Sequence, residues 1–285
     1  MAITHFDRLV TLRFVRPLQR AGIIPRRAGV PILMYHSICE EPEPGVAGYY
    51  RTRTRPDVFA QQMAWLHQRG CRTAGLEEIA DSRKNQEAAK EPVVAITFDD
   101  GFQDFLVQAA PALERFGFTA TVYLPTAFIA DRRCSFLGRP CLTWEEVLEL
   151  RRRGIQFGSH TVNHPVLHQM QWGDVQRELW DSKRRMEDRL QSPVASFAYP
   201  YAFPQEDHRF VGRFRELLRS IGYCHGVTTV IGRVRPDDDQ FTLKRLPMNS
   251  GDDRALLAAK LEGAYDWLRG PQGLVRRIKS WKRPG

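Results

Sequence analysis

Alternation between helix-like and strand-like segments constrains the fold of this 285-residue chain more than any other feature. Apolar spacing or capping residues predict helices over residues 59–69, 143–152, 175–190 and 210–221. Short apolar segments typical of buried strands lie before and between them, at 30–36, 93–98, 119–124, 155–158 and 194–198. Because strands that alternate with helices pair in parallel, we expect an α/β fold built on a parallel sheet.

Two adjacent carboxylates end the predicted strand 93–98. Asp99 and Asp100 follow it directly, and Gly101 comes next. Carboxylates are rarely buried unless they are paired or bound to a metal. A divalent cation would stabilise the pair and separate their roles into one ligand and one proton acceptor. The alternative interpretation of this segment alone is an Asp-Gly turn with no chemical role.

A pair of histidines follows the predicted strand 155–158. His160 and His164 are four residues apart, so a single helical turn would place both imidazoles on one side. Pro165 disfavours a longer helix, so we expect a turn at a strand end. A histidine pair alone is usually structural. Together with Asp100, however, it forms a His₂-carboxylate set with open positions, which is typical of a catalytic metal rather than a closed structural zinc site.

The third segment is the predicted strand 194–198 with the sequence Tyr199-Pro200-Tyr201 after it. It is either a strand end packed with aromatic rings or a rigid wall whose backbone N–H, at Tyr201, points at a bound carbonyl.

These motifs, in this order, resemble the polysaccharide deacetylase family (carbohydrate esterase family 4), and the resemblance extends from about Val30 to Leu246. It implies a single catalytic domain folded as a deformed (β/α)7-type barrel. It also implies removal of an N-acetyl group from an amino sugar. The implied residue roles are metal ligand for Asp100, His160 and His164, general base for Asp99, and oxyanion binding by the backbone amide of Tyr201.

The residues suit this chemistry without the family. A divalent metal polarises a carbonyl and lowers the pKa of its water toward ~7. Asp99 would accept a proton from that water, and the Tyr201 N–H would help to bind the oxyanion. Zn²⁺ is the metal that the resemblance implies. Co²⁺, Ni²⁺ or Fe²⁺ would also suit a His₂-carboxylate set.

The sequence departs from the common family pattern at two points. Ala198 stands where most members carry an arginine that braces the base, and no Leu-x-His motif supplies a general acid near the C-terminus. The predicted strand 30–36 ends on His36. A histidine at the end of the first strand resembles the arrangement in a circularly permuted subgroup of the family, which processes poly-N-acetylglucosamine. We therefore expect His36 to be the general acid, with His225 as the alternative. Arg245 is the best candidate for the brace, since a guanidinium suits bidentate contact with a carboxylate.

Positive charge is concentrated at the two ends of the chain. The whole chain carries +9, residues 1–27 carry +5 and residues 269–285 carry +6, so the remainder carries −2. We expect a basic amphipathic extension over 1–29, a catalytic barrel over 30–268 and a basic tail over 269–285. Such ends suit an anionic membrane surface, although plain docking of terminal helices on the barrel explains them equally well. No motif for binding nucleic acid accompanies the charge.

Three features of the sequence bear on the cellular location that we predict. We find no signal peptide, no segment long enough to span a membrane, and five cysteines without regular spacing. These features favour the cytoplasm, at or near the inner membrane face.

Three functions are open at this point. The first is a metal-dependent hydrolase that removes N-acetyl groups from an amino sugar, or from a glycan or glycolipid containing N-acetylglucosamine, in cell-surface polysaccharide biosynthesis. The second is a deacylase, deformylase or imidase for another small molecule. The third is a non-catalytic barrel that binds glycan or membrane. Residues 39–55 either face the substrate or form an ordinary connection.

Overall fold

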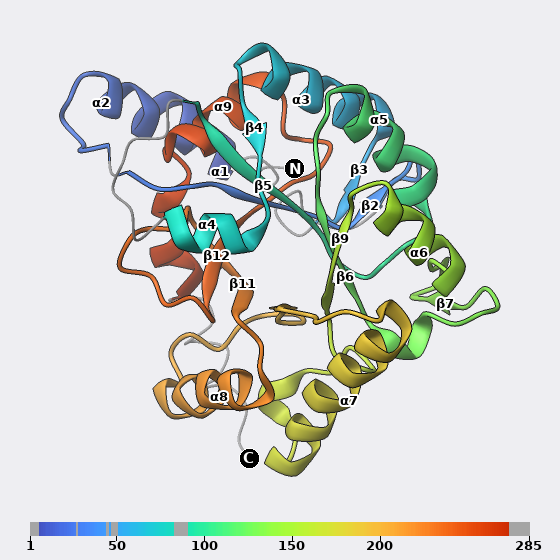
Figure 1. The fold of residues 1–285 in the computed structure, drawn as a ribbon. Helices are drawn as coiled ribbons and strands as arrows, with labels where there is room; N and C mark the ends of the chain where they lie inside the picture. Colours follow the sequence, from blue (N-terminus) through green and yellow to red (C-terminus); the bar gives the residue numbers. More distant parts are fainter. Residues whose placement is uncertain (1–5, 27, 44–45, 47–50, 83–90, 274–285) are drawn as a thin grey trace.

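A computed structural model describes residues 6–26, 28–43, 46, 51–82 and 91–273. Seven parallel strands close into a barrel, in the order β1-β12-β11-β10-β9-β6-β5 and back to β1 (Figure 1). A further short strand, β4, pairs with the start of β5. The strands are β1 Ile32–Tyr35, β4 Arg72–Thr73, β5 Val93–Phe98, β6 Thr121–Leu124, β9 Gln156–Ser159, β10 Ser196–Ala198, β11 His225–Ile231 and β12 Leu243–Pro247. The predicted parallel sheet and (β/α)7-type barrel are confirmed.

Helices surround the barrel, as Figure 1 shows. They are α3 Pro56–Gln68, α4 Leu76–Ser82, α5 Ala110–Arg115, α6 Trp144–Arg152, α7 Trp172–Leu190, α8 His208–Ile221 and α9 Arg254–Glu262. A π-helical turn, η3 Phe105–Ala109, leads into α5, and single 3-10 turns occur at η4 Thr126–Phe128, η5 Leu167–Gln169 and η6 Asp266–Leu268. Two short strand pairs lie outside the barrel: β2 Ser37–Ile38 with β3 Arg53–Thr54, and β7 Ser135–Phe136 with β8 Arg139–Pro140.

The predicted helices are present, with starts set by their capping residues. Helix α6 has the expected capping box, in which Thr143 and Glu146 bond each other's backbone N–H. Helix α8 ends as predicted on Gly222, whose φ of +89° is in the left-handed region. Helix α3 begins earlier than predicted, at Pro56, because proline suits the first turn of a helix.

The N-terminal segment is a helix that lies against the barrel. It runs through α1 Phe6–Val10, a π-helical turn η1 Thr11–Val15 and α2 Arg16–Arg20. The Thr11 hydroxyl accepts a hydrogen bond from Trp267 Nε1, and Arg16 pairs with Glu262 at the end of α9. Residues 274–285, most of the predicted basic tail, lie outside the described residues. The boundaries at 29 and 269 therefore stay predictions.

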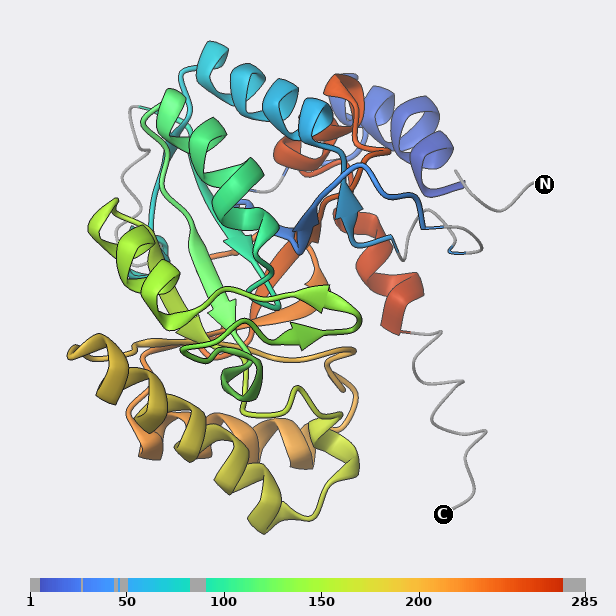
Figure 2. The same cartoon turned by 90° about the vertical axis from the view of Figure 1, so that its right-hand side faces the viewer.

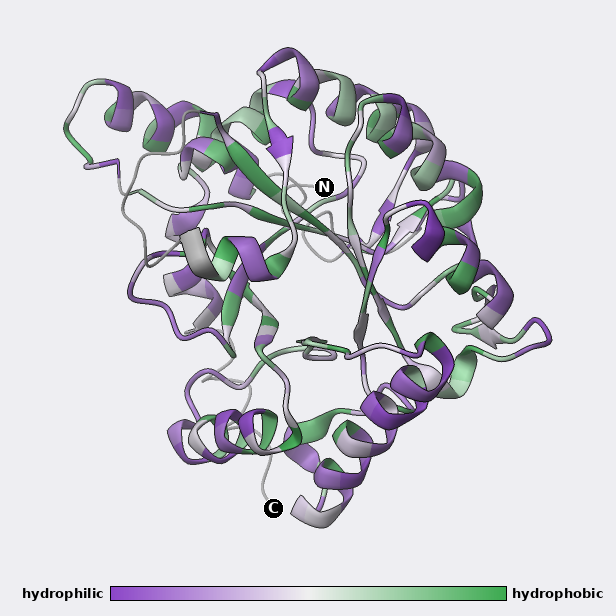
Figure 3. Ribbon diagram, viewed as in Figure 1, coloured by the Kyte–Doolittle hydropathy of each residue, from purple (hydrophilic) through white to green (hydrophobic). Residues whose placement is uncertain are grey.

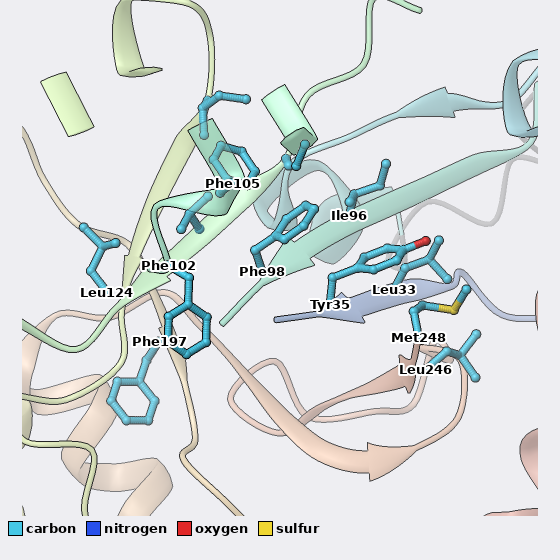
Figure 4. Close-up of a cluster of buried hydrophobic side chains, with 14 of the residues drawn as sticks. Leu33, Tyr35, Ile96, Phe98, Phe102, Phe105, Leu124, Phe197, Leu246 and Met248 are labelled. Atoms are coloured by element: carbon cyan, nitrogen blue, oxygen red, sulfur yellow. The ribbon is translucent and has the colours of Figure 1, made fainter. Parts of the chain in front are cut away.

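The hydrophobic core has two parts, on the two faces of the strands. Alternate residues of β5 point to opposite faces. Ile96 and Phe98 pack outward with Tyr35 and Phe105 (Figure 4), and the Phe59 ring of α3 packs on Phe98 in the same cluster. Ala95 belongs to a smaller cluster in the barrel interior. The same alternation directs Thr97 and then Asp99 toward that interior. Figure 3 shows the mostly hydrophilic outer surface of α7 by contrast.

No helix in the described part of the chain is long and apolar enough to cross a bilayer.

Candidate active site

The predicted site residues come together at one end of the barrel, where the C-terminal ends of its parallel strands meet. They are His36 after β1, Asp99 and Asp100 after β5, His160 and His164 after β9, Tyr201 after β10, and Arg245 within β12. All of them except Arg245, which is fully buried, line one cavity of about 680 Å³. Strand ends that are far apart in sequence therefore form one site.

A buried ion pair joins Asp99 to Arg245. Arg245 Nη1 donates to Asp99 Oδ1 at 2.6 Å and Nη2 donates to Oδ2 at 2.7 Å. The Arg245 Nε bonds the Thr228 carbonyl at 3.0 Å, which fixes the guanidinium plane. Burial alone raises the pKa of Asp99, but the charge and hydrogen bonds of Arg245 outweigh it and hold that pKa well below its usual range. Asp99 is thus ionised and fixed in orientation.

His36 lies beside Asp99 because their strands are neighbours in register. Tyr35 of β1 pairs with Phe98 of β5, so the next residue on each strand enters the site side by side. His36 Nε2 is 4.0 Å from Asp99 Oδ2, and the imidazole is partly exposed to the cavity.

The alternative histidine, His225, is wrong for this site. It is the first residue of β11, whereas Thr229 and Ile231 near the other end of the same strand line the cavity. A strand of seven residues spans roughly 20 Å, so His225 lies at the opposite end of the barrel.

Asp100, His160 and His164 converge on a single point. The Nε2 atoms of the two histidines are 3.1 Å apart, and Asp100 Oδ1 lies 3.6 Å from that of His160 and 3.3 Å from that of His164. Tetrahedral bonds of 2.0–2.1 Å to zinc would separate neighbouring ligand atoms by about 3.3 to 3.4 Å. The buried Asp100 Oδ1 has no hydrogen-bond partner among the described residues. The three side chains therefore fit a divalent cation.

His160 is held in the form that can bind a metal. Its Nδ1 lies 2.8 Å from the Ala198 carbonyl, so Nδ1 carries the proton and Nε2 presents its lone pair. Burial lowers the pKa of His160 to about 4, which keeps the imidazole neutral near pH 7.

The backbone around these ligands differs from the expected helical turn. Thr161 and His164 both adopt positive φ, +69° and +54°, and the turn is held by a bond from the His164 N–H to the Thr161 hydroxyl. Glu178 of α7 is buried and accepts bonds from the Val162 and Asn163 N–H groups. Sequence spacing alone carried no signal for this contact, because Glu178 lies in a run of charged residues.

Glycine is required after the carboxylate pair. Asp100 and Gly101 have φ of +72° and +59°, and a Cβ on Gly101 would approach Leu124 Cδ2 to 2.8 Å. Only glycine combines this conformation with that close approach.

Tyr201 forms part of the cavity wall. Its φ is +54°, its ring packs edge-on against His164 at 4.5 Å between centroids, and its side chain is 47% exposed. The oxyanion role of its backbone N–H stays a prediction.

The segment 39–55 contributes to the cavity, where Glu43, Arg51, Thr52 and Arg53 line one side. Tyr49 and Tyr50 lie outside the described residues. A second wall comes from the β7–β8 hairpin, where Arg139 pairs with Asp104 and Leu137 is 68% exposed.

Comparisons with known proteins identify relatives of this chain. The profile of the polysaccharide deacetylase family matches residues 86–223. YxkH of Bacillus subtilis (strain 168), named for the same family, is 29% identical over 239 residues, covering 82% of this chain and 77% of YxkH. Poly-beta-1,6-N-acetyl-D-glucosamine N-deacetylase of Escherichia coli (strain K12) is 27% identical over 164 residues, which cover 53% of this chain but only 24% of that enzyme.

Two solved structures are also similar to this chain. The Streptococcus pyogenes deacetylase PplD, determined in complex with acetate, has a TM-score of 0.69 at 28% identity, over 82% of this chain and 98% of PplD. IcaB from Ammonifex degensii has a TM-score of 0.64 at 22% identity, over 83% of this chain and 98% of IcaB, which shows a shared fold. Residues 86–223 of this chain therefore match the polysaccharide deacetylase family, whose members are metal-dependent hydrolases of N-acetyl groups on sugars, and the similarity to YxkH and PplD extends over 82% of the chain.

Proposed function

We propose that this protein removes N-acetyl groups from N-acetylglucosamine units of a glycan or glycolipid during cell-surface polysaccharide biosynthesis. One observation carries the proposal: an ionised, oriented Asp99 lies next to a metal-ligand set within one cavity. An amide is a poor electrophile, so its hydrolysis needs both a base and a polarising group. The name of the Escherichia coli relative supports the sugar.

Asp100, His160 and His164 would hold the metal, and their two imidazoles and one carboxylate favour Zn²⁺ among the divalent ions. When bound, the cation would polarise the acetyl carbonyl and lower the pKa of a nearby water molecule.

The remaining steps fall to the protein's own side chains. Asp99 would accept the proton as water adds to the carbonyl carbon, and Arg245 would keep Asp99 ionised and aligned before each turnover. The Tyr201 backbone N–H would donate to the developing oxyanion. When the C–N bond breaks, releasing acetate, His36 would protonate the leaving amine. His36 Nε2 is 4.0 Å from Asp99 Oδ2, so both side chains can reach one reacting centre.

The test is acetate release from N-acetylglucosamine oligomers of defined linkage by the zinc-loaded protein. We expect release by wild type and loss of at least a hundredfold in Asp99→Asn. The matched control is Asp131→Asn, because Asp131 is an exposed aspartate on the surface, paired with Arg189. Equal rates in wild type and Asp99→Asn would refute the proposal. Release of formate or opening of a cyclic imide instead would assign the site to another acyl substrate.

Location is part of the same proposal. We place the protein in the cytoplasm near the inner membrane face, and its five free thiols support a reducing compartment. Cell fractionation that recovers it outside the cytoplasmic and inner-membrane fractions would contradict this.

A further inference from the structure

The N-terminal helix carries an exposed apolar surface. Phe6, Leu9, Phe14 and Leu18 are 63%, 53%, 57% and 37% exposed, and Ile23 just beyond the helix is 69% exposed. Arg13 and Arg20 are exposed as well. We call the set Phe6, Leu9, Arg13, Phe14, Leu18 and Arg20 the outer helix face. Contiguous exposed apolar surface of this kind marks an interaction site on a folded protein.

Polar contacts hold the opposite side of this helix on the barrel. The Tyr265 hydroxyl donates to Asp7 at 2.5 Å, Arg8 pairs with Asp253 at 2.6 Å, and Arg16 pairs with Glu262 at 2.9 Å. Because these contacts fix the helix through its polar residues, they keep the outer helix face turned toward solvent.

Because of these contacts, the charged side chains that stay exposed on this segment are all positive. Asp7 is the only acidic residue between positions 6 and 26, and its carboxylate is bonded to Tyr265. Arg8 and Arg16 are paired with acids of α9 and its N-cap. The exposed charged residues of this segment are therefore all arginines: Arg13, Arg20 and Arg26. Apolar side chains interleaved with exposed arginines complement an anionic lipid surface.

The N-terminal helix packs against a segment that also lines the cavity. Trp267 bonds the helix through Thr11, and the next residue, Leu268, lines the cavity together with Gln272. Figure 2 shows the N-terminal helix, the segment after α9 and the β7–β8 hairpin together on its right-hand side. The hairpin also places the exposed Leu137 beside the cavity.

We propose that the outer helix face docks on an anionic phospholipid bilayer and so brings the cavity to the membrane surface. Insertion of Phe6, Leu9, Phe14 and Leu18 among the acyl chains would supply the apolar contribution. Arg13 and Arg20 would contact lipid phosphates. A sugar held at the membrane would then reach the site without leaving the surface. The docking itself is independent of the proposed hydrolysis.

The test is co-sedimentation of the full chain with vesicles of phosphatidylcholine alone or mixed with phosphatidylglycerol. We expect binding to the mixed vesicles, weakened by added salt. Arg13→Gln with Arg20→Gln should weaken it about fivefold per arginine. Leu9→Ser with Phe14→Ser should weaken it more than tenfold. All variants keep residues 274–285, so a contribution from that tail is common to them.

The matched control is Trp180→Ser with Arg184→Gln on α7. This pair removes one exposed aromatic ring and one exposed arginine from the far end of the molecule (Figure 2). It should bind like wild type. Equal binding of wild type and the Leu9→Ser/Phe14→Ser variant would overturn the proposal. A wild-type dimer in light scattering that this variant dissociates would also overturn it, by assigning the face to self-association.

Acetate release from a soluble oligomer separates this inference from the proposed function. The outer-face variants should release acetate at the wild-type rate, because none of the changed residues lines the cavity. Vesicle binding without any acetate release would leave the docking intact and refute the hydrolase. Acetate release without vesicle binding would refute the docking and leave the proposed hydrolase activity intact.

Discussion

Replacing Arg245 with methionine should both destabilise the protein and abolish its activity, because both effects follow from the loss of its ion pair with Asp99. The substitution keeps a long apolar side chain but leaves Asp99 buried without its partner. Asp99 and Arg245 are 2% and 0% exposed, and two bonds of 2.6 and 2.7 Å join them. Breaking a buried pair of this kind costs about 3 to 5 kcal/mol in the free energy of unfolding.

Urea denaturation of the metal-free protein measures this cost, since a chelator prevents a cation from replacing the guanidinium. The double variant Arg245→Met/Asp99→Asn should recover most of the lost stability, because no charge remains unpaired, yet stay inactive. The control Arg8→Met breaks the partly exposed pair with Asp253 and should cost at most about 1 kcal/mol. If Arg245→Met costs no more than Arg8→Met, the pair does not hold Asp99 as argued.

The same pair predicts a dependence on pH. Arg245 depresses the pKa of Asp99 in the folded state, so its stabilisation is complete above the unfolded pKa of about 3.9 and is lost as pH falls below it. The stability difference between wild type and Arg245→Met should therefore be constant near neutral pH and shrink under acid conditions. A difference that grows on acidification would contradict this.

Three other perturbations test the site. His36→Asn should lower kcat by about 10² to 10⁴, because it removes the group that would protonate the leaving amine; an unchanged kcat would exclude His36 as the acid. Chelation of the metal should abolish acetate release and lower the Tm. Adding free Zn²⁺ to 100 times its Kd should raise the free energy of unfolding again by about 2.7 kcal/mol. Activity that survives chelation would exclude a metal. Glu178→Ala leaves the Val162 and Asn163 N–H groups unpaired, so it should cost about 2 kcal/mol and weaken zinc affinity about tenfold, while Glu145→Ala on the exposed side of α6 should do neither.

The parts of the site that sequence predicts are those set by local structure. An apolar run that ends on polar residues places them at a strand end, and parallel pairing gathers the C-terminal ends of β1, β5 and β9. His36, Asp99 and His160 follow from this rule. The turn predicted at the end of β9 is present, but it is not helical, since Thr161 and His164 have positive φ and Glu178 bonds the Val162 N–H. That contact depends on where α7 packs, which its own periodicity does not reveal.

The partnership of Asp99 with Arg245 shows where local reasoning ends. The two residues are 146 positions apart and belong to strands that are not neighbours, since β1 lies between β5 and β12. Their contact exists because the barrel closes, which turns alternate residues of every strand toward one shared interior. The sequence alone could identify Arg245 as a candidate partner for a carboxylate, but closure of the barrel brings its guanidinium to Asp99. Replacing a buried ion pair by apolar side chains of similar volume is often neutral or stabilising, so the presence of this pair favours a role for Asp99 in catalysis rather than in folding.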